Sequence, residues 1–157
     1  MEPGRSPIRR HARAEDTFPE PMADPDCIFC KIAAGDLPAT RVYEDERTLA
    51  FMDIRPATRG HLLVIPREHA QDIHEIGPED LAAVVRTGQA MAALIRRRLR
   101  AEGVNLLNSA GATAWQTVFH FHLHVIPRYA DDGLRLPWVP APGDPDVVAG
   151  AAAELTR

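Results

Sequence analysis

Apolar residues alternate or recur along most of the chain from residue 27 onwards, and their spacing predicts the secondary structure. Short runs of β-branched and aromatic residues between turn-forming residues predict strands, and apolar positions repeating every three or four residues predict helices. The pattern predicts a short helix over residues 27–35, strands over 41–44, 47–54, 61–66, 104–108 and 117–128, a long helix between Gly77 and Gly103, and an Ala-rich helix after Pro145. Strands on both sides of one long helix predict an α+β fold, an antiparallel sheet with that helix packed on it.

The long helix carries one apolar face. Pro78 suits its first turn, where a missing N–H breaks no hydrogen bond. The residues that we expect to be buried are Leu81, Val84, Val85, Gly88, Ala92, Ile95 and Leu99. One side of this helix should therefore face the sheet.

The chain divides into a folded segment and two flanking segments. A length of 157 residues suits one domain with one core. Residues 1–25 hold five of the fourteen prolines and show no helix or strand period, so we expect a mobile arm there. Residues 26–130 hold the predicted sheet and long helix. Residues 131–157 should form a C-terminal tail that ends in the short helix.

Composition and charge exclude several classes of protein. The chain is 45% apolar, and 18 basic against 22 acidic residues give a net charge of −4. Proteins that bind long nucleic acid usually show a basic excess, which is missing here. No apolar run approaches the roughly 18–20 residues of a membrane span, and residues 1–25 lack the apolar core of a signal peptide. We therefore expect a cytoplasmic protein without a membrane partner.

The two cysteines, Cys27 and Cys30, form one C-x-x-C pair. They are too few and too close together to cross-link a secreted scaffold, which leaves metal binding or redox chemistry. A second pair of cysteines is absent, so the spacing alone favours two free reduced thiols.

Three histidines, His120, His122 and His124, alternate with apolar residues in the run FHFHLHVI. On a strand they would share one solvent-facing side at a repeat of roughly 6.6 Å, with Phe119 and its apolar neighbours in the core. Three histidines in register are rarely plain surface residues. Two chemical interpretations stay open: a metal site, or a neutral imidazole that attacks phosphorus.

The run QTVFHFHLHVIPR at residues 116–128 resembles the signature of the histidine triad (HIT) superfamily. The resemblance extends upstream through GHLLVIPREH, LAFMDI, VYEDE and CIFCKI, and so covers residues 27–128. It is closest to small bacterial members related to purine-nucleoside phosphoramidases and dinucleoside polyphosphate hydrolases. The resemblance implies the HIT fold, a sheet of five to six strands, and a homodimer that pairs through the long helix and a strand.

The same resemblance implies a hydrolase or transferase that cleaves at the α-phosphate of a purine nucleotide. His122 would be the nucleophile and form a covalent nucleotidyl-histidine, with His124 and His61 beside the phosphate. The other implied contacts are Phe29, Ile32, Phe51 and Ile54 around the base, Asp53 on the ribose, and Gln116 and Thr117 on the phosphate or the leaving group. Two rival hypotheses remain: a nucleotide-binding regulatory module with little turnover, and a metal-dependent hydrolase.

Two positions depart from the family's pattern. The position that commonly carries a phosphate-binding Asn aligns with Ser109, which would be a weak replacement, and Asn108 stands one place earlier. We count both Asn108 and Ser109 among the expected nucleotide contacts. Trp115 stands before Gln116, where Gly is common, so we expect a bulkier loop over the leaving group. Both departures bear on which substrate is cleaved.

Related bacterial members hold a structural zinc ion, and the resemblance changes the interpretation of the two thiols accordingly. The implied ligands are Cys27, Cys30, His69 and His120, and no organic cofactor is implied. A C-terminal Trp of the family can reach toward the partner subunit's site. Trp138 is either its counterpart or an anchor that packs on its own subunit.

Overall fold

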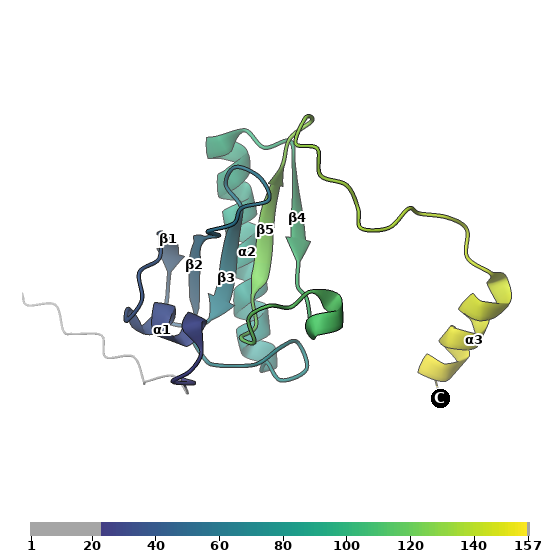
Figure 1. The fold of residues 1–157 in the computed structure, drawn as a ribbon, viewed down its shortest axis with the longest axis horizontal. Coiled ribbons are helices and arrows are strands. Elements are labelled where there is room, and N and C mark those ends of the chain that lie inside the picture. Colours follow the sequence, from purple (N-terminus) through teal and green to yellow (C-terminus); the bar gives the residue numbers. More distant parts are fainter. Residues whose placement is uncertain (1–22, 157) are drawn as a thin grey trace, which may run out of the picture.

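The computed structural model describes residues 23–156, so most of the predicted arm over residues 1–25 lies outside the described residues. The elements in chain order are α1 (Ile28–Ala34), β1 (Arg41–Glu44), β2 (Thr48–Met52), β3 (Leu62–Pro66), α2 (Pro78–Leu99), β4 (Gly103–Leu107), the 3₁₀ turn η1 (Ala112–Ala114), β5 (Leu123–Arg128) and α3 (Pro145–Leu155). The strands form one antiparallel sheet in the order β1-β2-β3-β5-β4. Figure 1 shows α2 running along this sheet. The predicted α+β architecture is confirmed.

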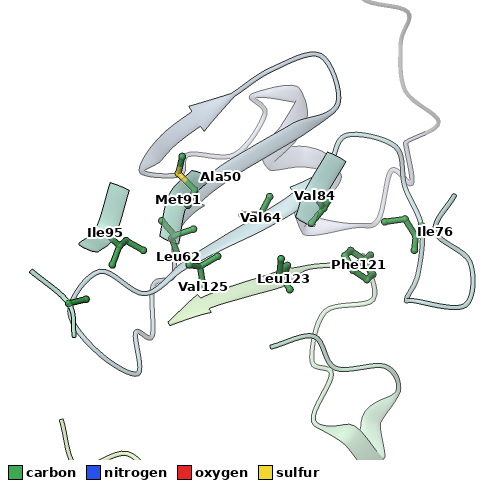
Figure 2. Close-up of a cluster of buried hydrophobic side chains, with 12 residues drawn as sticks. Ala50, Leu62, Val64, Ile76, Val84, Met91, Ile95, Phe121, Leu123 and Val125 are labelled. Carbon is green, nitrogen blue, oxygen red and sulfur yellow. The ribbon is translucent and has the colours of Figure 1, made fainter. Parts of the chain in front are cut away.

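Strands β2 and β3 are buried on both faces, because a helix covers each face. On one face Val64 and Leu123 pack with the side of α2 that carries Val84 and Ile95, as Figure 2 shows. The opposite face packs against α1 through Leu49, Phe51, Leu63, Ile65, Phe29 and Ile32. Successive side chains of a strand point to opposite faces, so each strand supplies both clusters. Several residues of this second apolar cluster also line the pocket described below.

The buried face of α2 differs in part from the sequence prediction. Val84, Gly88 and Ile95 are buried as expected, but Val85 is 46% exposed. Thr87 and Met91, which we did not expect to be buried, are buried on the inner face instead. Gly88 has a packing reason, since a Cβ there would lie 2.8 Å from the Leu123 side chain. The helix therefore sits close to β5.

The predicted strand over residues 117–128 is wrong in its first half. The observed strand β5 begins only at Leu123, and β4 pairs with it no further than Leu107 opposite His124. Residues 117–122 have no neighbouring strand to complete a ladder, and the Phe121 N–H instead donates to the Ala70 carbonyl. Phe119, expected in the core, is 43% exposed. Of the three histidines, only His124 therefore lies on a strand.

The C-terminal helix α3 forms after Pro145, as predicted, and buries none of its residues. Figure 1 shows it held away from the sheet at the end of a long extended segment. Trp138 in that segment is 62% exposed, which is inconsistent with a ring packed on its own subunit. A search of the described residues found no helix with the length and apolarity needed to span a membrane.

Candidate active site

One pocket of about 450 Å³ gathers most of the predicted nucleotide-binding residues. Its wall comes from α1, from β2 and the turn that follows it, and from the segment that leads into β5. Eight of the predicted residues line it: Phe29, Ile32, Phe51, Asp53, Ile54, Thr117, His122 and His124. Ile54 is 92% exposed, so it borders the mouth of the pocket and does not form the enclosed base wall that we expected. His61, Asn108, Ser109 and Gln116 are not among the lining residues.

His122 presents one ring nitrogen with a free lone pair. Its Nδ1 lies 2.8 Å from the His120 carbonyl oxygen, which can only accept, so Nδ1 carries the proton. Nε2 then carries the lone pair and has no hydrogen-bond partner among the described residues. The ring is 4% exposed and packs edge-on against Phe29 at 5.4 Å. Burial lowers the pKa of His122, against the opposing effects of the His120 carbonyl and Asp53, so the ring is neutral at pH 7.

His61 and His124 form a hydrogen-bonded pair whose proton positions follow from one backbone group. The Ala57 N–H donates to His61 Nδ1 at 3.0 Å, which leaves the His61 proton on Nε2. That proton points at His124 Nδ1, 2.9 Å away, so His124 carries its own proton on Nε2. Burial lowers the pKa of His61, and burial together with His122 and His61 lowers that of His124 to about 4. Both rings are therefore neutral.

The nucleophilic and donor nitrogens belong to adjacent rings. The ring centroids of His122 and His124 are 5.0 Å apart at an interplanar angle of 72°. A neutral Nε2 with a free lone pair thus lies beside a ring whose Nε2–H is available to donate. This arrangement can attack an electrophile and donate a hydrogen bond to the group that leaves it. His120 and His122 are not on a solvent-facing strand side as expected, because both precede β5 and are buried; His124 lies on β5 and is half-buried.

Asp53 lies close to the histidine pair. Its Oδ1 accepts the Arg55 N–H at 2.7 Å, and its Oδ2 lies 3.6 Å from His61 Nε2, an ion pair only if that ring is protonated. Ligand atoms of Asp53, His61 and His124 lie within 4.8 Å of one another. However, the Ala57 N–H and the His61–His124 hydrogen bond already occupy the imidazole lone pairs. The geometry favours a hydrogen-bonded network over a metal centre here.

The side-chain amides of two predicted phosphate ligands hydrogen-bond to backbone groups in this structure. The Asn108 Nδ2 donates to the His122 carbonyl at 2.9 Å, just beyond the last β4–β5 pair, so it continues the ladder with a side chain. The Gln116 amide is fully used by the backbone, accepting from the Gly111 N–H and donating to the carbonyls of Gln71 and Val118. Ser109 is buried. Thr117 is exposed on the pocket wall and stays a predicted ligand contact.

Three of these contacts could not be predicted from the sequence. The Ala57 N–H fixes the tautomer of His61, the His120 carbonyl fixes that of His122, and Asn108 holds the backbone of His122. Two of the three are backbone groups, which leave no trace in residue type. The position of Asn108 at the end of a predicted strand is the only available signal, and it does not distinguish a clamp from a ligand.

A cluster of cysteine and histidine side chains brings together all four predicted metal ligands. The ligand atoms of Cys27, Cys30, His69 and His120 lie within 4.8 Å of one another. His120 Nδ1 lies 3.5 Å from each Sγ, and His69 Nδ1 lies 3.3 Å from Cys30 Sγ. Tetrahedral zinc with bonds of about 2.3 Å to sulfur and 2.0 Å to nitrogen would set these edges near 3.6 Å. The spacing therefore fits zinc.

The protonation of this cluster also fits a cation. The His120 Nε2–H donates to the Pro66 carbonyl at 2.9 Å, so the lone pair of Nδ1 faces the thiols. Burial, the largest influence, and the neighbouring Cys27 together raise the pKa of Cys30 to about 11, despite the opposing hydrogen bond from the Asp24 N–H. A divalent cation reverses such a shift, because it binds the thiolate. The donor set is two sulfurs and two imidazole nitrogens, as in closed structural zinc sites.

Comparison with known proteins identifies the family. The HIT domain family matches residues 34–131. Adenosine 5'-monophosphoramidase hnt1 of Schizosaccharomyces pombe is 36% identical over 131 residues, which cover 83% of this chain and 96% of that protein.

Solved structures agree. A Streptococcus mutans protein matches with a TM-score of 0.81 at 38% identity and covers 95% of this chain and 97% of its own. A zinc-bound histidine triad family protein from Mycobacterium smegmatis matches with a TM-score of 0.68 at 43% identity, over 83% of this chain and 96% of its own. The chain therefore belongs to the HIT domain family.

Proposed function

We propose that the protein hydrolyses purine nucleoside phosphoramidates or dinucleoside polyphosphates at the α-phosphate through a covalent nucleotidyl-His122 intermediate. The observation that carries the proposal is the free lone pair on the neutral Nε2 of His122, beside the Nε2–H of His124 at the pocket wall. The activity named for the fission-yeast relative supports the choice of reaction class.

Two displacements account for the reaction. In the first, His122 Nε2 forms a bond to the α-phosphorus, and the bond from phosphorus to the leaving nitrogen or oxygen breaks. The His124 Nε2–H donates a hydrogen bond to the leaving atom, and a leaving amine takes up its proton from solvent. In the second, water attacks the same phosphorus, releases a proton to solvent, and the bond from phosphorus to His122 breaks. Each ring ends in its starting tautomer. Phosphoryl-type transfer depends mainly on positioning and charge stabilisation, which a preorganised buried site supplies.

The pocket wall suggests how the nucleotide lies. Phe29 and Phe51 pack edge-to-face at 5.5 Å and, with Ile32, give an apolar surface for a base. Asp53 keeps unshared lone pairs that can accept from ribose hydroxyls. A purine is the proposed base, by likeness to the family.

We propose that Cys27, Cys30, His69 and His120 hold a structural zinc ion. When bound, zinc supplies a cross-link among the start of α1, residue 69 and the segment before β5. The zinc-bound mycobacterial relative and the donor spacing support this assignment. The site uses no side chain that the proposed displacement needs, so its duty is to hold the fold, and no organic cofactor enters the reaction.

The remaining proposals concern assembly, location and boundaries. The strand β4 is an edge of the sheet, and its Leu106 and Leu107 are 47% and 43% exposed, which supports a homodimer that pairs through this strand. Two reduced cysteines in a metal-type cluster support a cytoplasmic location. We keep residues 26–130 as the domain, which agrees closely with the match over residues 34–131.

Mass spectrometry tests the central step. The protein is mixed with an adenosine phosphoramidate, quenched in base and digested, and the peptide that contains residues 116–128 is sequenced. One added adenylyl group on His122 is the expected result, and His122→Asn should carry none. Wild-type activity that is very low and does not change in His122→Asn would contradict the proposal and leave the nucleotide-binding module.

A further inference from the structure

Trp115 has a backbone conformation that side chains of its size avoid. Its φ and ψ are 70° and 20°, in the left-handed region, and the only other non-glycine residue with positive φ in the described part of the chain is Arg100, at the C-terminal cap of α2. The left-handed conformation is unfavourable for an L-residue, because its Cβ comes too close to the following carbonyl oxygen. Strained residues of this kind cluster at functional sites.

The loop around Trp115 imposes this conformation. The N–H groups of Ala114 and Gln116 both donate to the Gly111 carbonyl at 3.1 Å. The Gly111 N–H returns a hydrogen bond of 2.7 Å to Oε1 of Gln116, whose side chain is 4% exposed. A closed ring of hydrogen bonds therefore fixes the backbone at Trp115, whatever its side chain does.

The indole itself gains little from its own chain. It is 65% exposed, and no aromatic ring packs against it among residues 23–156. Most of the ring surface is therefore available to a ligand.

The position of Trp115 relates it to the pocket. Thr117, two residues later, lines the pocket together with His122 and His124. Consecutive Cα atoms are about 3.8 Å apart, so the Cα atoms of Trp115 and Thr117 lie within about 7.6 Å. An indole extends far enough to bridge such a distance from the rim.

The direction of the displacement points the leaving group outward. Attacking and leaving atoms lie roughly on opposite sides of the phosphorus. Because the His122 ring is 4% exposed, an attack by its Nε2 comes from the buried side, and the leaving group points toward solvent. Trp115 is not itself a lining residue, but it is exposed and stands two residues before Thr117 of the pocket wall, close enough to reach the solvent side of the pocket.

We infer that Trp115 is a stacking platform that selects leaving groups carrying a flat aromatic ring. This inference rests on the proposed function and adds to it a residue that determines specificity. Stacking of a ring on an aromatic side chain is sequence-tolerant, so the inferred class is any aromatic leaving group, whether a base or an aromatic amine. A small or aliphatic leaving group gains nothing from the indole.

The test compares two adenosine 5'-phosphoramidates whose leaving amines are 2-phenylethylamine and butylamine, with similar basicity and only one aromatic ring. Trp115→Gly suits positive φ and keeps the loop, and Trp115→Leu keeps apolar bulk. Both variants should lower kcat/KM for the phenylethyl substrate about 10-fold, mainly through KM, and change that for the butyl substrate by less than about 2-fold. Trp115→Phe should restore most of the loss. Equal changes with both substrates, or none with either, would overturn the inference.

A binding measurement separates this inference from the proposed function. If the wild-type protein turns over neither substrate, the proposed function fails. Trp115 emission is then followed in Trp138→Phe, where it is the remaining tryptophan. A change on titration with the phenylethyl compound, larger than with the butyl compound, supports the platform. Identical emission with both compounds contradicts it.

Discussion

Two histidine clusters share one short segment of chain, and they differ in which ring nitrogen they present. His120 donates from Nε2 to the Pro66 carbonyl and turns Nδ1 to the thiols. His122 donates from Nδ1 to the His120 carbonyl and leaves Nε2 free at the pocket. A single carbonyl in each case therefore decides whether the ring is suited to binding a metal or to attacking a substrate.

Residue type and spacing therefore do not define the role of a histidine. The two rings are two residues apart, both nearly fully buried and both with lowered pKa values. Their environments differ in chemistry: two sulfurs surround one, and a second imidazole with an N–H donor stands beside the other. Changes at each cluster should therefore have separable effects.

The largest expected effect separates the clusters by activity. His122→Asn removes the attacking lone pair and should lower kcat by about 10⁴-fold or more, as expected when a nucleophile is lost. The thermal midpoint should stay close to that of the wild type, because the zinc ligands are intact. Steady-state kinetics and thermal denaturation of the same preparation check both parts. A lowered midpoint without loss of kcat would reverse the assignment of the two rings.

The second effect separates them by stability. Removing zinc with a chelator, or replacing Cys30 by Ser, should lower the thermal midpoint by about 10 °C, because a ligand at about 1,000 times its Kd adds roughly 4 kcal/mol. Metal analysis should show about one equivalent in the wild type. Adduct formation on His122 should persist in the chelated protein below its midpoint.

Two outcomes would contradict the metal assignment. Less than about half an equivalent of zinc, with both thiols freely titratable, would leave the cysteines as free thiols. Turnover that requires added zinc in a protein that stays folded without it would favour a metal-dependent hydrolase instead.

The third effect concerns pH. The pKa of His124 is about 4 in the folded protein, because of burial and the neighbouring imidazoles, against an unfolded value of 6.5. Between these values the unfolded chain binds more protons, so the free energy of unfolding falls as pH drops from 6.5 to 4. We expect a loss of about 2 kcal/mol from this ring, less than the full shift because it keeps some contact with solvent. Denaturant unfolding across this range measures it.

A matched substitution sharpens the pH prediction. His124→Gln should flatten the slope of stability against pH, whereas His74→Gln, at an exposed position, should leave that slope as it is. Identical slopes for His124→Gln and the wild type would contradict the neutral state that we assign to the pair.

The smallest effect tests the backbone clamp on the nucleophile. Asn108→Ala removes the hydrogen bond to the His122 carbonyl and should lower kcat about 10-fold, at a cost of roughly 1 kcal/mol in stability. Asn105→Ala is the control, since that side chain accepts from Arg128 at an exposed position. Equal losses in both variants would show that Asn108 acts on the strand and not on His122.

Much of the fold could be predicted because periodicity reports burial. The α+β architecture, the Gly35 end of α1 and the Pro78 start of α2 all follow from local signals. The limits of β5 could not be predicted, because strand length depends on a pairing partner and β4 ends opposite His124. Alternating histidines predict a strand, although a loop that leads into a strand can also place their side chains close together.

The site was predictable as a set of residues but not as a mechanism. The four residues of the metal-type cluster and eight residues of the pocket could be predicted from the sequence. Ile54 is more exposed than the predicted base contact would be. The proton positions could not be predicted, since Ala57 and the carbonyls of Pro66 and His120 act through backbone atoms. Gln116 and Asn108 were expected to contact phosphate, and their amides instead bond to the backbone.

The most direct test of the central claim is to observe the ring protons. Long-range ¹H–¹⁵N correlation at pH 7 distinguishes the two neutral tautomers and the imidazolium of each histidine. The account predicts a neutral His122 protonated on Nδ1 and a neutral His124 protonated on Nε2. A His122 ring protonated on Nε2, or on both nitrogens, would have no lone pair on Nε2 and could not be the nucleophile.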